Sequence, residues 1–100
     1  MAARCIARNL LQGYWISAMA CFVYVLASRR HGNVRTYVGW TTDLVRRLDQ
    51  HNKGAGAKST RGRAWVLVYA ERYATRREAM SREWHLKRDR KLRKMLAAQR

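Results

Sequence analysis

The sequence predicts one small folded domain that combines β-strands with α-helices. Its 100 residues suffice for a single domain with a modest core. Hydrophobic residues make up 48% of the chain and aromatic residues 10%, which favours a folded globule over a disordered basic tail. Runs of β-branched and aromatic residues alternate with segments of helical periodicity, and the sequence has no internal repeat, linker or second domain.

Three segments have the composition of strands. Residues 22–27 alternate two sets of apolar side chains in a β-branched and aromatic run. Residues 29–33 supply a turn, in which the glycine and the asparagine can take positive φ, and residues 34–40 form a second strand. The first two strands are therefore expected to form a hairpin. Residues 65–70 are apolar on both faces, as in a strand that is covered on both sides.

Helix signals follow the second and third strands. A polar residue at position 41, 42 or 43 can cap a helix that is expected to run to about residue 52. The spacing of Thr75 and Glu78 is that of a capping box, which opens a helix to about residue 87. Residues 88–90 predict a bend before a last basic helix that reaches residue 98.

The chain is strongly basic. It carries 22 Lys and Arg residues against 6 Asp and Glu residues, a formal net charge of +16. A charge of this size on a short chain repels itself unless an anionic partner shares it. Nucleic acid is favoured over an anionic membrane surface, because the charges are interleaved with aromatic residues and do not follow one amphipathic stripe. DNA is the expected partner, RNA stays open as a substrate, and no membrane association is expected.

The first 18 residues are interpreted as a dispensable N-terminal extension of a domain that covers residues 19–100, with Met19 an alternative start. Residues 10–28 carry no charge and follow two arginines, a pattern that resembles a signal peptide. Polar interruptions of the apolar run, and its continuation into the first predicted strand, favour extension over export. Cys5 and Cys21 form no paired ligand motif, so reduced thiols in a cytoplasmic protein are expected and zinc is not.

Helical periodicity places two side chains of the first helix at the edge of its buried face. With Leu44 at zero, a rotation of about 100° per residue puts Leu48 near 40°, His51 near −20° and Arg47 near −60°. Arg46 falls at about 200° and is expected to face solvent. The two neighbouring arginines should therefore differ in function.

A carboxylate is predicted on the inner face of the second helix. On the same construction Glu83 lies about 40° from Ala79, inside the apolar stripe, whereas Glu78 lies about 100° to the other side and serves the capping box. An unpaired carboxylate on an inward face is costly, so Glu83 is expected to meet a cation or a metal ion. Mg²⁺ takes oxygen ligands from one or two carboxylates together with water.

Five short motifs resemble the signatures of one enzyme family. They are Phe22-Val23-Tyr24, Tyr37-Val38-Gly39, Arg47 at ten residues after the second tyrosine, His51-Asn52 and Arg82-Glu83-Trp84. On these residues the chain resembles the GIY-YIG endonucleases. It is most similar to their small stand-alone bacterial members and to the nuclease domain of the structure-selective junction endonucleases. The resemblance runs from residue 22 to about residue 87, about two thirds of the chain.

The resemblance implies an α+β fold, in which helices flank a small three-stranded antiparallel sheet, and phosphodiester hydrolysis with one metal ion. One phenolate, with Tyr24 the first choice, would activate or orient water beside Tyr37 at the phosphate. Both tyrosines stay open as the base. Arg47 would stabilise charge on the phosphoryl oxygens, and Glu83 would hold Mg²⁺ or Mn²⁺. His51 would act as a general acid or base or as a proton relay.

Two departures from the family pattern affect what the resemblance implies. Phe22 stands where the first signature has its leading glycine, and we interpret this as a subfamily variant that keeps the chemistry. The chain also lacks the cysteine-rich zinc module of the eukaryotic junction nucleases. Targeting by a partner through such a module is therefore not expected.

Two basic segments are predicted to contact the nucleic-acid backbone. Residues 53–63 form a glycine-rich loop that lacks the glycine before the lysine of a P-loop and follows a helix, so nucleotide binding is rejected. This loop is expected either to touch phosphates or to be an ordinary mobile loop, whereas the basic run of residues 87–100 is expected to grip phosphate. The predicted contact residues are Lys58, Thr60, Arg61, Arg63, Lys87, Arg88 and Arg90.

The remaining aromatic and histidine residues are given structural roles. Trp40 is expected either in the core or as a stacking surface for a splayed base. His31 and His85 are assigned to the turn and to the solvent-facing side of a helix. The residues predicted for the core are Trp65, Tyr69, Met80 and Trp84.

Two functional hypotheses of different classes follow from these observations. The favoured one is a metal-dependent endonuclease that acts on DNA, with branched, nicked or flapped structures as the substrates to test first. The alternative is a non-catalytic, basic nucleic-acid-binding module on the same fold, since the net charge alone would explain binding. A membrane-associated protein that uses the uncharged N-terminal stretch ranks last.

Overall fold

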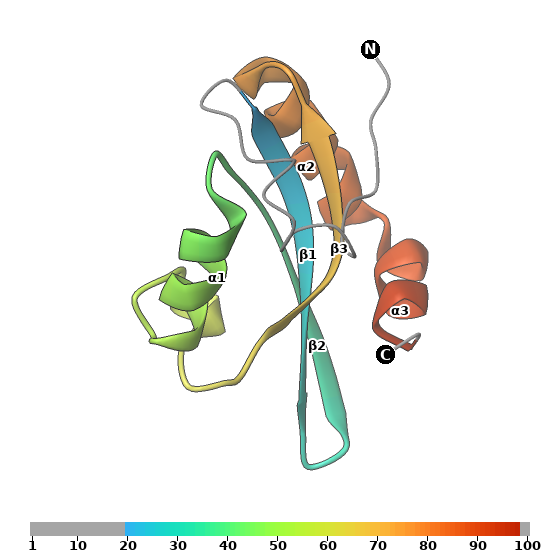
Figure 1. Ribbon diagram of the computed structural model, residues 1–100. Coiled ribbons are helices and arrows are strands. Elements are labelled where there is room, and N and C mark those ends of the chain that lie inside the picture. The colour runs from blue at the N-terminus through green and yellow to red at the C-terminus, as the bar shows by residue number, and fades with distance from the viewer. Residues whose placement is uncertain (1–19, 99–100) are drawn as a thin grey trace.

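The structure is a computed structural model that describes residues 20–98 (Figure 1). Two strands begin this part of the chain, and a third strand lies between two groups of helices. The elements are β1 (Cys21–Arg30), β2 (Asn33–Thr41), α1 (Leu44–Asn52), the 3-10 helix η2 (Lys58–Thr60), β3 (Val66–Tyr73), α2 (Arg76–Arg88) and α3 (Arg90–Ala98). The predicted N-terminal extension lies outside the described residues.

The three strands form one antiparallel sheet with the order β2-β1-β3, so the first strand of the chain is at its centre. α1 lies on one face of the sheet, and α2 and α3 lie on the other (Figure 1). This arrangement confirms the expected α+β fold with a three-stranded antiparallel sheet flanked by helices. Because helices cover both faces, β1 is buried from Cys21 to Ser28.

The hydrophobic core has two parts, one on each face of the sheet. Alternate side chains of β1 point to opposite faces and supply both parts. The part under α1 includes Phe22, Tyr24, Leu26, Leu44 and Trp65. The part under α2 and α3 includes Val23, Val25, Val38, Ala79, Leu86 and Leu96.

The hairpin turn is shorter than the predicted turn over residues 29–33, because β1 continues to Arg30 and β2 begins at Asn33. His31 and Gly32 have positive φ of 51° and 77°, and Arg30 pairs with Asn33 across the hairpin. Two central residues with positive φ are what a type I′ turn requires, and the twist of that turn matches the twist of the strands. The expectation that Asn33 belongs to the turn was therefore wrong, because Asn33 is the first residue of β2.

β3 differs from its predicted form in length and in burial. It runs from Val66 to Tyr73, three residues past the predicted end. Trp65 precedes the strand and is buried, as expected, but Val66 is 37% exposed. The prediction of a strand covered on both faces was wrong there, because Val66 is the first residue of a strand at the edge of the sheet.

α2 buries a narrower stripe than predicted. Ala79 and Leu86 are fully buried, but Met80 is 48% exposed and Trp84 is 54% exposed, so the two predicted core residues are on the surface. Both positions lie about 100° or more around the helix from Ala79. The covered stripe is therefore limited to residues close to the line between Ala79 and Leu86.

The predicted bend after α2 is confirmed. α2 ends at Arg88, and the carboxylate of Asp89 accepts a hydrogen bond from the Leu92 N–H at 3.0 Å in the first turn of α3. In residues 20–98, no helix has both the length and the apolar character needed to cross a membrane.

Candidate active site

α1 presents two functional side chains to the sheet. Asp43 is its N-cap, and the Asp43 carboxylate accepts a hydrogen bond from the Arg46 N–H at 3.1 Å. Leu44 is buried against the sheet, and His51, two turns later, has an exposed fraction of 0%. Arg47 is half-buried beside this face, whereas Arg46 is exposed, as the helical periodicity predicted.

The imidazole of His51 lies close to both tyrosines. The Tyr24 hydroxyl oxygen and His51 Nε2 are 2.9 Å apart. The centroid of the Tyr37 ring is 4.8 Å from that of His51 and 6.3 Å from that of Tyr24. β1, β2 and α1 therefore bring three of the predicted site residues to one place.

Gly39 on β2 leaves room for this arrangement. It pairs with Tyr24 across the sheet. A Cβ atom at Gly39 would lie 2.5 Å from the Tyr24 hydroxyl oxygen and 2.8 Å from Tyr24 Cζ. Both distances are well inside van der Waals contact, so any side chain would displace the phenol. The glycine of the second motif is thus required by packing, since its φ is not positive.

Burial controls the protonation of the two hydrogen-bonded groups. Burial raises the pKa of Tyr24 to about 12, although a hydrogen bond from the Arg47 guanidinium acts to lower it. The pKa of His51 is lowered by its burial and by the positive charge of Arg47. At neutral pH the phenol therefore keeps its proton, and the neutral imidazole offers one N–H and one lone pair.

The fifth predicted site residue, Glu83, lies on α2 and acts on Tyr24 through its negative charge. Its side chain is 21% exposed, and its carboxylate lies 3.6 Å from the Lys87 ammonium one turn later. Its negative charge is near enough to Tyr24 to help raise the pKa of the phenol. The structure therefore brings Tyr24, Tyr37, Arg47 and His51 together, whereas Glu83 comes from the helix on the other face of the sheet and reaches Tyr24 only through its charge.

The carboxylate of Glu83 fits a metal ion that keeps most of its water. Within residues 20–98 there is no cluster of three or more His, Cys, Asp or Glu side chains, so a cage made only of protein ligands is not built there. Mg²⁺ is commonly held by one or two carboxylates, several waters and the phosphate oxygens of a substrate. A single, partly exposed carboxylate near a cationic site matches that mode.

The glycine-rich loop contacts the imidazole of His51, which the sequence did not reveal. His51 Nδ1 and Thr60 Oγ1 are 2.8 Å apart, and Thr60 is fully buried. The prediction that Thr60 touches the nucleic-acid backbone was therefore wrong. A Cβ atom at Gly56 would lie 2.5 Å from His51 Nδ1, so the loop backbone lies directly against the imidazole. A loop threonine nine residues from a histidine carries no local signal for such a contact.

Asn52 fastens the same loop to the start of β3. Its amide nitrogen donates to the Trp65 carbonyl at 3.0 Å, and its carbonyl accepts from the Trp65 N–H at 2.6 Å. The Trp65 indole N–H donates to the Thr60 carbonyl at 2.7 Å. The motif position next to His51 is therefore a loop anchor in this structure.

The predicted nucleic-acid-binding residues fall into two groups. Lys58, Arg61 and Arg90 are exposed. Three others already have partners: Lys87 pairs with Glu83, and the Arg88 guanidinium lies 3.6 Å from the centre of the Trp84 ring. Arg63 donates to the Ser28 hydroxyl at 3.0 Å and to the carbonyl oxygens of Ser28 and Asn33 at 3.2 Å. Arg63 therefore braces the loop against the hairpin.

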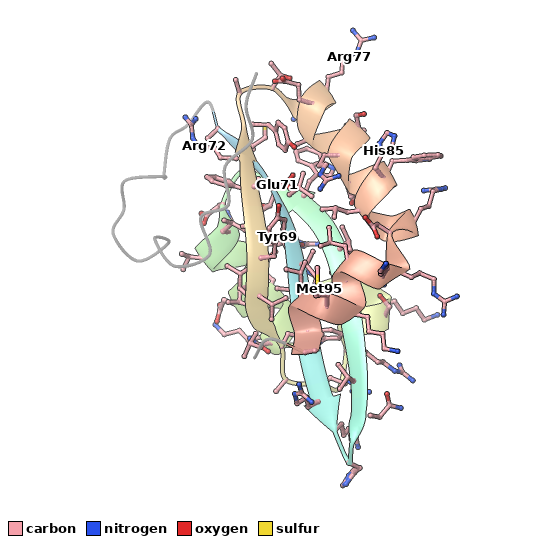
Figure 2. All side chains as sticks on the ribbon, turned by 90° about the vertical axis from the view of Figure 1, so that its right-hand side faces the viewer. Tyr69, Glu71, Arg72, Arg77, His85 and Met95 are labelled. Atoms are coloured by element: carbon pink, nitrogen blue, oxygen red, sulfur yellow. The ribbon has the colours of Figure 1, made fainter. Side chains whose placement is uncertain are left out.

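A second buried polar group, also missed from the sequence, joins β3 to α2. The Glu71 carboxylate accepts two hydrogen bonds from the Arg82 guanidinium, at 2.9 and 3.1 Å, and one each from the Tyr69 and Tyr73 hydroxyls. Figure 2 shows Tyr69 and Glu71 on β3, whereas Arg77 and His85 project outward from α2. Arg82 directly precedes Glu83, so this group fixes the segment of α2 that carries the candidate metal ligand.

Comparisons with known proteins agree with these motifs. A family model described as the GIY-YIG catalytic domain matches residues 20–95. A UPF0213 protein of Clostridium perfringens is 46% identical over 66% of this chain, one of Streptococcus pneumoniae is 50% identical over 67%, and one of Haloquadratum walsbyi is 54% identical over 51%. The matches span 69%, 66% and 58% of those proteins, so the chain covers about two thirds or less of their lengths. No solved structure matches the chain significantly.

Proposed function

The chain belongs to the GIY-YIG catalytic domain family, and on that premise we propose that it is a metal-dependent endonuclease that hydrolyses phosphodiester bonds in DNA. Family membership indicates a nuclease domain and a nucleic-acid substrate. The dependence on a metal ion, the preference for DNA and the roles of the site residues are the parts that we propose.

One observation carries the proposal: two phenols, a guanidinium and a neutral imidazole meet under α1, and the charge of a carboxylate on α2 reaches one of the phenols. Packing alone does not call for this set, because buried polar groups are costly unless each finds a partner. Phosphodiester hydrolysis, in contrast, uses groups of these kinds. The reaction needs a group that removes a proton from water and positive charge at the phosphoryl oxygens.

The roles proposed for the side chains follow from their positions. Tyr24, as phenolate, would take the proton of the attacking water, with Tyr37 beside it at the phosphate. Arg47 would donate hydrogen bonds to the phosphoryl oxygens as negative charge grows on them. The Gln50 side-chain oxygen already accepts from one nitrogen of Arg47 at 3.0 Å, which holds the guanidinium in place and leaves its other donors for substrate.

Glu83 would hold Mg²⁺ or Mn²⁺, which when bound supplies positive charge at the phosphate. The ion would replace Lys87 as the partner of the carboxylate. The Lys87 side chain is 52% exposed and can turn into solvent without leaving a buried charge unpaired. It would then be free to contact the nucleic-acid backbone, as the sequence predicted.

The proposed substrates include branched or flapped DNA. The resemblance of the motifs to those of the junction endonucleases supports this choice. The net charge of +16 supports binding to any phosphate backbone, so RNA belongs in the same cleavage panel.

The alternative function is a nucleic-acid-binding module without catalysis. The same net charge supports it, because phosphate contacts alone would give salt-dependent binding. Arg46 and Arg47 separate the two functions, since they are neighbours in sequence with different surroundings. A catalyst uses only the half-buried Arg47, whereas a general binder would use both residues alike.

The test is cleavage of labelled duplex, flap and junction DNA, and of matched RNA, with Mg²⁺ or Mn²⁺. We expect the wild-type protein to cut at least one substrate and Arg47→Ala to lose about 100- to 1,000-fold in turnover, because it removes a donor to the developing charge. Arg46→Ala should retain turnover. If the wild type cuts no better than Glu83→Gln, and both arginine variants lose similar affinity, the binding module is the correct function.

A further inference from the structure

His51 has a buried contact that the roles proposed above do not use. Its Nδ1 atom is 2.8 Å from Thr60 Oγ1, and both residues have an exposed fraction of 0%. Thr60 Oγ1 is also 2.8 Å from the Ala57 carbonyl oxygen. Two oxygen atoms at this distance attract each other only if a proton lies between them, and a carbonyl has none to give. The Thr60 hydroxyl therefore donates to Ala57.

This hydrogen bond fixes the proton on the imidazole. The Thr60 hydroxyl has one proton, which is used toward Ala57, so its oxygen can only accept from His51 Nδ1–H. A neutral imidazole with its proton on Nδ1 has a lone pair on Nε2. The Tyr24 hydroxyl, 2.9 Å from Nε2, is then the donor in the second hydrogen bond.

The arginine on the other side of the phenol agrees with this direction. A guanidinium can only donate hydrogen bonds. Arg47 lies close enough to the Tyr24 phenol to act on its pKa and can only donate to it, which leaves the proton of Tyr24 for His51. Each hydrogen bond from Tyr24 through His51 and Thr60 to the Ala57 carbonyl therefore has one donor and one acceptor.

The loop holds Thr60 and His51 at this distance. The Trp65 indole N–H binds the Thr60 carbonyl at 2.7 Å, and the missing side chain of Gly56 lets the backbone close over the imidazole. The position of the Thr60 hydroxyl against His51 is therefore fixed by the backbone of η2 and by the hydrogen bond from Trp65.

We propose that Thr60 is a positioning residue that holds His51 in the tautomer with its proton on Nδ1, so that Nε2 takes the phenolic proton of Tyr24 during hydrolysis. This inference rests on the proposed function, because the proton transfer matters only if Tyr24 acts on water. Thr60 itself touches neither substrate nor the reacting atoms.

The proton transfer balances without a further reactant. The O–H bond of Tyr24 breaks as an N–H bond forms at His51 Nε2. The phenolate then accepts a proton from water, whose oxygen bonds to phosphorus while the bond from phosphorus to the leaving oxygen breaks. The leaving oxygen takes a proton from solvent, and the imidazolium returns one to solvent.

The test measures the tautomer and the turnover in the same proteins. In ¹⁵N-labelled wild type, long-range ¹H–¹⁵N spectra should show a protonated Nδ1 and an unprotonated Nε2 for His51, with the signal assigned by its loss in His51→Gln. Thr60→Val keeps the shape but removes the acceptor, so it should shift the proton toward Nε2. Turnover should fall on the order of 100-fold at unchanged KM.

Thr60→Ser is the matched control, since it restores the hydroxyl and should restore both the tautomer and the turnover. Thermal unfolding checks that each variant is folded, and if Thr60→Val unfolds, the wild-type and Thr60→Ser spectra still decide the tautomer. A proton on Nε2 in the wild type, or a Thr60→Val protein that keeps both tautomer and turnover, would overturn the inference. Absence of cleavage by the wild type would refute the proposed function separately, because the spectra do not depend on cleavage.

Discussion

Gly39 and Gly32 illustrate two different reasons for a glycine in one hairpin. Gly32 has positive φ in the turn, and a Cβ atom there would meet nothing within 4 Å. Gly39 has an ordinary strand conformation, but a Cβ atom there would collide with the Tyr24 phenol. Gly32 is therefore needed for the conformation of the turn, whereas Gly39 is needed to leave space for the Tyr24 side chain.

Gly39→Ala should therefore impair cleavage by more than its loss of stability explains. Overpacking costs about 1–3 kcal/mol in the free energy of unfolding, and relief of the clash would move the Tyr24 hydroxyl away from His51. Urea unfolding and turnover on the best substrate measure the two effects. Gly32→Ala is the control: it should cost about 1–2 kcal/mol because of its positive φ and leave turnover unchanged. Equal turnover in both variants would contradict the proposed role of the Tyr24–His51 contact.

At the scale of elements, the buried Glu71 carboxylate joins β3 to α2. Desolvation by burial acts to raise the pKa of Glu71, but hydrogen bonds from Arg82, Tyr69 and Tyr73 outweigh it and hold that pKa below its ordinary value. The ionised carboxylate of Glu71 is therefore more stable in the folded protein than in the unfolded chain. The resulting stabilisation is present above the unfolded pKa of about 4.5 and is lost as pH falls through the lower, folded-state pKa.

Glu71→Gln tests this connection through the pH dependence of stability. At pH 7 the variant should lose about 2–4 kcal/mol, because the Arg82 guanidinium keeps its charge without a carboxylate partner. The difference from wild type should shrink as the pH is lowered below about 4.5. Urea unfolding between pH 7 and pH 3 measures both effects. Asp49→Asn, which removes an exposed pair with Lys53, should change stability by less than about 1 kcal/mol, and an equally small effect at Glu71 would refute the account.

At the scale of the whole molecule, the positive charge is not uniformly available to a ligand. Arg63 is held by the hairpin, Arg82 by Glu71, and the Arg93 guanidinium donates to Thr36 and to carbonyl oxygens at the end of α2. Lys58 and Arg61 are exposed at the loop surface. The net charge of +16 thus overstates the number of cations that are ready to meet phosphate.

Arg61→Ala and Arg63→Ala should have different effects, because Arg61 is exposed and Arg63 is hydrogen-bonded within the protein. Removal of one phosphate contact by Arg61→Ala should reduce the slope of log K against log salt by about 0.9 and leave the Tm unchanged. Arg63→Ala should lower the Tm, since the hairpin loses three hydrogen bonds, and it should change the salt slope less. Titration of a fluorescent duplex at several salt concentrations and thermal unfolding give the two readouts. The reverse pattern would show that Arg63, and not Arg61, contacts nucleic acid.

Local patterns in the sequence predicted the elements of this fold and the faces of α1 well. Leu44, Arg46, Arg47 and His51 lie where a 3.6-residue period puts them, because a helix repeats the same geometry at every residue. The same period failed for Met80 and Trp84. It gives the direction of each side chain, but the width of the buried stripe depends on where the sheet ends beneath the helix.

The contacts that complete the site could not be predicted in this way. Thr60 beside His51 and Glu71 beside Arg82 are hydrogen bonds between separate elements, and each depends on where a loop or a strand is placed in three dimensions. No periodicity or spacing marks a threonine as the partner of a histidine nine positions away. The family motifs indicated the residues nearest the proposed chemistry, whereas the side chains that hold them in place came only from the structure.

The proposed centre draws its five groups from β1, β2, α1 and α2, and the last of them stands at residue 83. A ribosome that builds the chain from its N-terminus releases both phenols, the guanidinium and the imidazole well before that carboxylate. On the proposed function, a truncated product that stops short of residue 83 would bind nucleic acid through its positive charge without cleaving it. If the proposed function is correct, the order of synthesis would thus keep an unfinished chain from hydrolysing nucleic acid before its last catalytic group has been made.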